Sequence, residues 1–273
     1  MKNLFFTDSN KNDTKSDVVV LLHGFCETGE IWQDFIPALS KNFRVIVPDL
    51  GGFGQSTALL PENTKNKISD DISKEISIET LANQVVVLLD FLKIKKAIFI
   101  GHSLGGYVIL AMQANATWQK YIQKIGLFHS SALADSTEKK KQRTKVIEHI
   151  KKIGVERYIE SFVTPLFSKS NVAKMPEKIA FLENICKKTP LQTLLSVTAA
   201  MRERPDTTQA LTQAQVPVLF IIGKDDNAIP LESYEKQIFL PQNAVIHILA
   251  DVGHMGMLEK PAQTLKIVLD FCN

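Results

Sequence analysis

Residues 97–115, AIFIGHSLGGYVILAMQAN, constrain the fold and the chemistry of this chain more than any other segment. Residues 97–100 are an apolar run typical of a buried strand, and a run typical of a helix follows the turn Gly-His-Ser-Leu-Gly. Between a strand and a helix, G-x-S-x-G holds its serine in a sharp turn with the hydroxyl exposed above the sheet. The helix N-terminus adds main-chain N–H groups and a positive dipole end. We therefore expect Ser103 to be a nucleophile.

Two later loops contain carboxylates and an imidazole, in the chain order Ser, Asp, His that is expected with this kind of turn. Residues 216–222 are an apolar, β-branched run typical of a buried parallel strand, and Asp225 and Asp226 follow it. Residues 244–250 are a second strand-like run, and His254 follows it. Open α/β sheets bind their ligands beyond the carboxyl ends of the strands, so both loops are expected near the serine.

These residue types suit nucleophilic catalysis. A serine hydroxyl is a poor nucleophile at neutral pH and needs an adjacent base. His254 can accept the proton and return it to the leaving group, because an unperturbed imidazole has a pKa of about 6.5. A carboxylate holds the imidazole in the right tautomer and stabilises the imidazolium. We expect Asp226 in that role, because the acid usually occupies the third position after the strand-ending glycine; Asp225 is then a loop or helix-capping residue.

An oxyanion-binding loop is expected after an early strand. Residues 18–22, VVVLL, are typical of a strand, and the loop His23-Gly24-Phe25 follows them. With a serine turn of this kind, one oxyanion donor is the N–H of the residue after the nucleophile, and the other comes from such an early loop. The sequence therefore predicts donors at the N–H groups of Leu104 and Phe25, each worth about 3 kcal/mol in acyl transfer.

The chain resembles the α/β-hydrolase superfamily, in its cofactor-free, helical-capped branch of small esterases and related hydrolases. The resemblance covers most of residues 18–130 and 214–272. It is carried, in family order and at family spacing, by the segments VVVLLHGFCETGEIW, FRVIVPDLGGFGQS, AIFIGHSLGGYVIL, IIGKDDNAIP and DVGHMGMLEKP.

This resemblance implies a fold and a role for each candidate site residue. The fold is α/β, with a mostly parallel central sheet, helices on both faces and an inserted helical cap. No metal and no organic cofactor is implied. The implied site residues are Ser103 as nucleophile, Asp226 as acid, His254 as base, and the N–H groups of Phe25 and Leu104 as oxyanion donors.

The expected organisation is a core in two parts around an inserted segment, because the alternation of strand-like and helix-like runs breaks from about residue 131 to residue 204. We expect the first core part at residues 1–131, a helical cap at 132–207 and the second core part at 208–273. A cap would exclude water and shape the pocket. Its predicted helices are residues 140–153, 155–162, 178–187 and 191–201. In the first core part we expect strands at residues 4–7, 43–47 and 122–128, helices at 31–39 and 77–92, and a surface excursion at 59–76.

Composition excludes several other classes of protein. With 273 residues, 45% hydrophobic, and a net charge of +3, the chain resembles an ordinary globular protein and not a nucleic-acid-binding one. No apolar run approaches the roughly 18 residues of a membrane span, and the N-terminal apolar stretch is too short for a signal peptide. We expect a cytoplasmic protein that acts on a small-molecule substrate, without nucleic-acid or membrane partners; the sequence predicts no oligomeric state. The three cysteines show no metal-ligand spacing, and Cys26 is expected to pack, with a redox role as the alternative.

Several other residues have both a structural and a functional interpretation. Residues 138–145, EKKKQRTK, are expected to form the solvated face of a cap helix, with the steering of anionic substrates as the alternative. His23 and His102 are expected to hydrogen-bond loop backbone, with a metal-ligand role as the alternative. The residues predicted to form the substrate-binding wall are Phe25, His129 and Met255.

The expected reaction is hydrolysis of a small, fairly apolar carboxylic ester through an acyl-enzyme on Ser103. Other reactions stay open. The same residues can cleave C–C bonds in diketone-like substrates, or support lyase or perhydrolase chemistry. The chain can also be a ligand-binding or receptor protein on a hydrolase scaffold. Haloalkane or epoxide hydrolysis is disfavoured, because related folds use a carboxylate nucleophile where this chain has Ser103.

Overall fold

The computed structural model describes residues 3–11, 17–59 and 76–273. The strands of these residues form one sheet: β1 (Phe6–Asp8), β2 (Val18–Leu22), β3 (Arg44–Pro48), β4 (Ala97–His102), β5 (Ile122–Phe128), β6 (Val218–Gly223) and β7 (Ala244–Leu249). Their order across the sheet is β1-β3-β2-β4-β5-β6-β7. Strand β1 is antiparallel to β3, and the other neighbours are parallel. The mostly parallel α/β sheet predicted from the sequence is confirmed.

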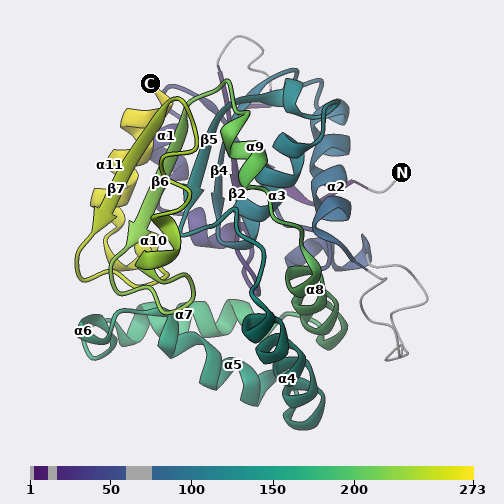
Figure 1. Ribbon diagram of the computed structural model, residues 1–273, viewed down its shortest axis with the longest axis vertical. Coiled ribbons are helices and arrows are strands. Elements are labelled where there is room, and N and C mark those ends of the chain that lie inside the picture. Colours follow the sequence, from purple (N-terminus) through teal and green to yellow (C-terminus); the bar gives the residue numbers. More distant parts are fainter. Residues whose placement is uncertain (1–2, 12–16, 60–75) are drawn as a thin grey trace.

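Helices cover both faces of the sheet, which is why its strands are apolar on both sides. Every residue of β3, β4 and β6 is buried, as parallel strands between two helical layers must be. In Figure 1, one face of the sheet is covered by α2 (Ile78–Phe91), α3 (Leu104–Ala114) and α9 (Thr208–Thr212). The other face is covered by α1 (Ile36–Leu39) and α11 (Pro261–Cys272). No helix in the described part of the chain is both long and apolar enough to cross a membrane.

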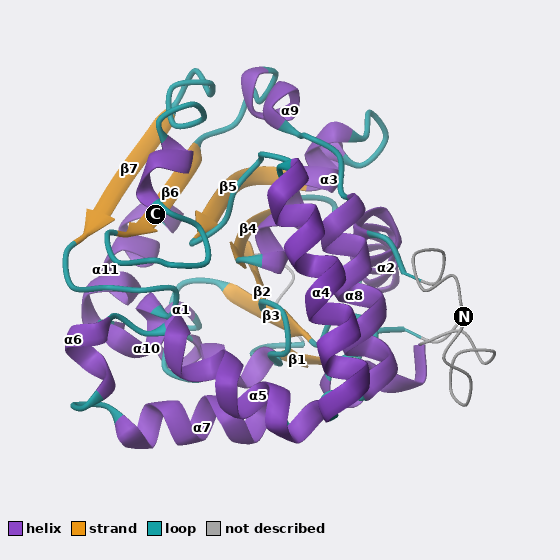
Figure 2. Ribbon diagram, turned by 60° about the horizontal axis from the view of Figure 1, so that its bottom comes forward, coloured by secondary structure: helices purple, strands orange, loops and turns teal. Residues whose placement is uncertain are grey.

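A further group of helices lies beyond the carboxyl ends of the strands, between β5 and β6 in the chain (Figure 1 and Figure 2). They are α4 (Thr137–Ile153), α5 (Val155–Val163), α6 (Lys169–Val172), α7 (Pro176–Cys186) and α8 (Leu191–Glu203). Helix α4 packs along α8, and α5 along α7. The amphipathic stretches predicted in this segment are all helical, whereas α6 is too short to give a periodic pattern.

The prediction of a single helix at residues 31–39 is wrong. The structure has a 3₁₀ turn, η1 (Gly29–Trp32), and then the short α1. Pro37 explains the break, because it has no N–H to donate to a preceding turn and occupies one of the first positions of α1.

Other predicted elements lie close to the observed ones. The strand predicted at residues 4–7 is shifted to β1, and the one at 122–128 is β5. The hydroxyl of Ser77 accepts the N–H of Thr80 and caps α2 as predicted. The surface excursion predicted at residues 59–76 lies almost wholly outside the described residues. The remaining short helical elements are η2 (Gly54–Leu59), η5 (Gln119–Tyr121), η6 (Thr164–Leu166), η7 (Leu231–Tyr234) and α10 (Gly256–Glu259).

Candidate active site

Ser103 lies between β4 and α3 in a strained main-chain conformation. Its φ of 47° and ψ of −109° fall in a region that residues with a side chain rarely adopt. The Ser103 N–H donates to the carbonyl of Phe128 (3.0 Å), and the Ser130 hydroxyl donates to the carbonyl of Ser103 (2.7 Å). These bonds hold a conformation that costs about 1–3 kcal/mol, and strain of this kind is typical of functional sites.

The two glycines of the turn let the strand and the helix approach closely. A Cβ on Gly101 would lie 2.5 Å from the main chain of Gly105, and a Cβ on Gly105 would lie 2.6 Å from the carbonyl oxygen of Leu22. Side chains do not tolerate contacts this short, so both positions need glycine. The G-x-S-x-G spacing is therefore a packing requirement of the turn.

His254 is hydrogen-bonded to Asp226 and not to Asp225. The Nδ1 atom of His254 lies 2.7 Å from Oδ2 of Asp226, and both side chains are buried. The other carboxylate oxygen of Asp226 accepts two N–H groups of its own loop, at 2.8 and 2.9 Å. Asp225 instead accepts a hydrogen bond from the hydroxyl of Ser168 (2.7 Å). The neighbouring aspartate therefore points away from the imidazole.

Electrostatics make this imidazole a better base than an ordinary histidine. Burial opposes the charged form of His254, but the Asp226 carboxylate outweighs burial and raises the pKa of His254. Burial also opposes ionisation of Asp226, but the charge of His254 and the hydrogen bonds outweigh it and lower the pKa of Asp226. Asp226 is therefore a carboxylate at neutral pH.

The main-chain N–H groups of Phe25 and Leu104 have no hydrogen-bond partner among the residues that the structure describes. Leu104 is the first residue of α3, where an N–H group has no acceptor within the helix. Phe25 lies in the loop after β2, next to Gly24, whose own N–H donates to Glu27 (2.6 Å). Free N–H groups next to a serine are able to bind an oxyanion.

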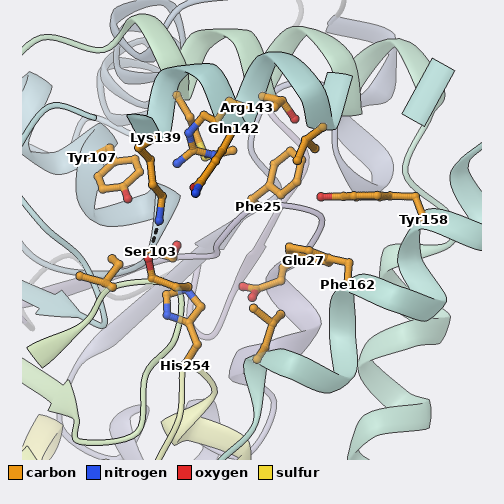
Figure 3. A pocket seen from close by; sticks show the side chains of 16 residues that line it. Phe25, Glu27, Ser103, Tyr107, Lys139, Gln142, Arg143, Tyr158, Phe162 and His254 are labelled. Carbon is orange, nitrogen blue, oxygen red and sulfur yellow. Dashed lines mark hydrogen bonds between the residues drawn. The ribbon is translucent and has the colours of Figure 1, made fainter. Parts of the chain in front are cut away.

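A cavity of about 250 Å³ lies between this edge of the sheet and the helices beyond it. Ser103 and His254 lie next to each other in its lining, and Phe25 is part of its wall (Figure 3). The segment between β5 and β6 contributes both apolar or aromatic and polar lining residues: Val146, Tyr158, Phe162, Leu166 and Met201, and Lys139, Gln142, Arg143 and Thr198. The loops expected to meet at the serine therefore do meet there, in a pocket of a size suited to a small molecule.

Of the three residues predicted for the wall, Phe25 is the one that the structure places in the lining. His129 and Met255 are fully buried away from this cavity. The ring of His129 lies behind the site, with Nδ1 3.8 Å from Oδ2 of Asp226. Burial lowers the pKa of His129 well below its usual value, so the ring is neutral. The end of β5 points this side chain inward, which the sequence does not reveal.

Sequence reasoning did not single out Glu27, which is buried, lines the cavity and pairs with His102. Oε2 of Glu27 lies 2.9 Å from Nδ1 of His102, and Nε2 of His102 lies 2.9 Å from the main-chain oxygen of His254. The expectation that His102 hydrogen-bonds loop backbone is therefore confirmed. The two residues lie close in sequence to Phe25 and Ser103, but no pattern indicates that they pair.

Cys26 is buried in the loop that follows β2. Burial raises the pKa of Cys26 well above its usual value, as expected of an unreactive packing residue. In residues 3–11, 17–59 and 76–273, no cluster of three or more His, Cys, Asp or Glu side chains is placed to hold a metal ion.

Known proteins share this architecture over nearly the whole chain. Among curated proteins, the chain is 25% identical over 278 residues to the 2-hydroxy-6-oxononadienedioate/2-hydroxy-6-oxononatrienedioate hydrolase of Burkholderia vietnamiensis (strain G4 / LMG 22486). That alignment covers 96% of this chain and 89% of the relative.

Solved structures and a family model extend the comparison. A thermophilic esterase from Thermogutta terrifontis, with malate bound, is 26% identical with a TM-score of 0.85, over 98% of this chain and 92% of the other. The enol-lactonase from Burkholderia xenovorans LB400 shares the fold, at 23% identity and a TM-score of 0.84, over 98% and 95% of the two chains. A family model described as the alpha/beta hydrolase fold matches residues 17–261. The chain therefore belongs to the alpha/beta hydrolase fold family and is a hydrolase.

Proposed function

We propose that this protein is a serine hydrolase that cleaves a small, fairly apolar carboxylic ester through an acyl-enzyme. Ser103 is the nucleophile, His254 the base and Asp226 the acid. The observation that carries the proposal is the His254–Asp226 hydrogen bond of 2.7 Å in a site where His254 and a strained serine line one cavity. A nucleophile, a base and a group that orients the base are the parts that such catalysis needs.

The reaction begins when His254 takes the proton of the Ser103 hydroxyl as the oxygen attacks the ester carbonyl. The N–H groups of Phe25 and Leu104, which lack protein acceptors among the described residues, stabilise the oxyanion of the tetrahedral intermediate. His254 then protonates the leaving alcohol, and an acyl group remains on Ser103. Water enters, gives a proton to His254 and attacks the acyl carbonyl. His254 then returns this proton to the Ser103 oxygen as the bond between that oxygen and the acyl carbon breaks, and the acid leaves.

We also propose that the helices α4 to α8 act as a cap, within residues 132–207, over the core of residues 1–131 and 208–273. More than half of the residues that line the cavity come from this segment, which supports this role. A cap excludes water from the reacting atoms and strengthens every electrostatic interaction in the site. It also sets the size of the substrate, and about 250 Å³ favours a short acyl group.

The direct test is release of p-nitrophenolate from p-nitrophenyl acetate, butyrate and octanoate by the purified protein. We expect turnover that falls from butyrate to octanoate, because the cavity is small. Ser103→Ala should lower turnover by about 10⁶-fold, the loss seen when a serine nucleophile is removed. Retention of most of the activity in Ser103→Ala would overturn the proposal.

C–C bond hydrolysis is the second candidate, because the Burkholderia vietnamiensis relative is named a 2-hydroxy-6-oxononadienedioate/2-hydroxy-6-oxononatrienedioate hydrolase. The same nucleophile and base can serve that reaction on a diketone-like substrate. A vinylogous diketone assayed beside p-nitrophenyl acetate separates the two. Serine-dependent cleavage of the diketone with negligible ester turnover would replace the first candidate by the second.

A further inference from the structure

One face of α4 lines the cavity beside the proposed nucleophile. Lys139, Gln142, Arg143 and Val146 are spaced at i, i+3, i+4 and i+7, which places them on one side of a helix, and all four line the cavity. Lys141 lies on another side of the helix and is exposed. The sequence predicts a solvated helix face at residues 138–145. These residues are instead divided between two sides of α4, and Lys139, Gln142 and Arg143 face the cavity.

Lys139 reaches into the cavity toward Ser103 and His254, as Figure 3 shows. Its Nζ donates to the carbonyl of Ala228 at 2.9 Å, in the loop that carries Asp226. It is close enough to His254 for its charge to oppose the raised pKa of that imidazole. Within the part of the chain that the structure describes, Lys139 forms no ion pair with a carboxylate. Its ammonium is therefore partly buried without a carboxylate in direct contact, although Asp135 and Asp226 stabilise its charge at longer range.

Arg143 belongs to a second group of charges next to this lysine. Arg143 and Arg204 both pair with Asp135, and Nη1 of Arg204 lies 2.7 Å from Oδ1 of that carboxylate. Two guanidinium groups thus share one carboxylate, and Lys139 adds a third cation. Burial lowers the pKa of Lys139, and the charge of Arg143 lowers that pKa further.

The carboxylates closest to the reacting atoms form their ion pairs with histidines and not with Lys139. Glu27, the carboxylate in the cavity lining, is paired with His102. Asp226 is paired with His254. The α4 side of the cavity is therefore left with excess positive charge, and burial makes an unpaired ammonium costly.

The other side of the cavity is lined by aromatic rings. The rings of Tyr158 and Phe162 are stacked, with centroids 5.3 Å apart, and Phe25 meets Phe162 edge to face at 5.9 Å. In Figure 3 these rings lie on the right, whereas Lys139 lies on the left, above Ser103. A ligand that spans the cavity therefore meets aromatic rings at one end and cations at the other.

We propose that Lys139 and Arg143 form a subsite for a carboxylate of the substrate. The substrate class is an ester that carries a free carboxylate a few bonds from the scissile carbonyl, with an apolar remainder along the aromatic side. This inference rests on the proposed ester hydrolysis and narrows its substrate. A carboxylate in the subsite accepts charge-assisted hydrogen bonds, which are about twice as strong as neutral ones.

The kinetic test compares two substrates of equal acyl length: the p-nitrophenyl monoester of adipic acid and p-nitrophenyl hexanoate. The rate with Ser103→Ala protein is subtracted as background. We expect wild-type kcat/KM to favour the anionic ester, and Lys139→Gln to lower that preference by about tenfold, the value of one charge-assisted hydrogen bond. Lys139→Arg, which keeps the charge, should retain most of the preference.

Lys141→Gln is the matched control, because it removes the same charge from an exposed position on the same helix. It should keep the wild-type preference, while added salt should weaken the preference only modestly because the subsite is partly buried. Equal loss on both esters in Lys139→Gln would mean that the lysine only ties α4 to the carbonyl of Ala228, and would overturn the inference. The absence of any wild-type preference for the anion would overturn it as well.

A binding measurement separates this inference from the proposed reaction. The probe is monobenzyl adipate, titrated by calorimetry into Ser103→Ala protein and into Ser103→Ala/Lys139→Gln protein. We expect about tenfold weaker binding in the double variant. If no ester is hydrolysed by the wild type but binding still depends on Lys139, the ester proposal fails and the anion subsite stands. If binding does not depend on Lys139, the subsite fails whatever the turnover.

Discussion

The imidazole of His102 donates from Nε2 to the main-chain carbonyl of His254 over 2.9 Å, and so links the residue before Ser103 to the loop of the proposed base. A carbonyl oxygen only accepts, so this nitrogen carries a proton. Nδ1 of the same ring faces Glu27 at 2.9 Å. Burial opposes ionisation of Glu27, but His102 outweighs burial and lowers the pKa of Glu27. Glu27 is therefore a carboxylate that orients His102, and through it the His254 loop.

Replacing Glu27 by Gln should lower both stability and turnover. Oε2 of the carboxylate accepts from the N–H of Gly24 as well as from His102, and an amide oxygen at this position lacks the negative charge that strengthens both hydrogen bonds. A hydrogen bond to a buried charged group contributes about 1.5–3 kcal/mol, so we expect a loss of that size in the free energy of unfolding, measured with urea. Turnover should fall about tenfold or more, because the loop of Phe25 and the His254 loop both lose support.

Glu30→Gln is the control for this change, because Glu30 lies three residues away and is exposed. It should leave the urea midpoint and the ester turnover close to those of the wild type. A Glu27→Gln protein as stable and as active as the wild type would show that the link between the two loops is not needed.

Asp226→Asn should damage turnover far more than Asp225→Asn. Asp226 lies 2.7 Å from His254, whereas Asp225 accepts from the hydroxyl of Ser168. An amide in place of the acid favours the wrong tautomer of the imidazole, which costs roughly 10⁴-fold in kcat in other serine hydrolases. The measurement is kcat on p-nitrophenyl butyrate, with Asp225→Asn as the matched control. A larger loss in Asp225→Asn would reassign the acid.

The pH dependence of turnover should report the raised pKa of His254. A base must be neutral to accept a proton, so kcat/KM should rise with pH through an apparent pKa above the ordinary value of 6.5. The Asp226 carboxylate raises this pKa against the effect of burial. In Asp226→Asn, the pH profile of the remaining kcat/KM should therefore move to lower pH. A profile that moves to higher pH in Asp226→Asn would contradict this origin of the shift.

Much of the proposed catalytic centre could be predicted because each part has a local signal. The sequence around Ser103 combines a strand, a turn whose glycines are sterically required, and a helix. His254 and Asp226 follow apolar runs that are strands β7 and β6. Strand β5 has the predicted bounds although Gln123 and Lys124 interrupt its apolar residues, because the buried stretch at its carboxyl end stops at His129.

The rest depends on contacts between distant segments. Lys139 and Lys141 are the same residue type in the same basic stretch. Only the orientation of α4 relative to the sheet makes Lys139 line the cavity and leaves Lys141 exposed. His102 and Glu27 are 75 residues apart, and their pairing needs β2 and β4 to be neighbours. The prediction of one helix at residues 31–39 failed for a local reason. The apolar residues there are spaced as in a helix, but Pro37 interrupts the helix.

Glu259 shows how a residue outside the cavity holds the proposed base in place. Its Oε1 accepts the N–H groups of Gly253 (2.8 Å) and Met255 (3.2 Å), the two residues that flank His254. Its Oε2 accepts the N–H of Ser168 at 2.8 Å and the side-chain amide of Asn171 at the same distance. One buried carboxylate thus fixes the His254 loop and ties it to the segment that precedes and forms α6.

Glu259→Gln should therefore lower kcat more than it raises KM, because it displaces the base without touching the cavity wall. The amide keeps one accepting oxygen but turns a donor toward N–H groups that need an acceptor, and we expect about 1.5–3 kcal/mol less free energy of unfolding. Glu232→Gln, at an exposed position, is the control and should change neither quantity. Activity and a urea midpoint are measured on both variants. An unchanged kcat in a clearly destabilised Glu259→Gln protein would mean that the His254 loop keeps its position without this carboxylate.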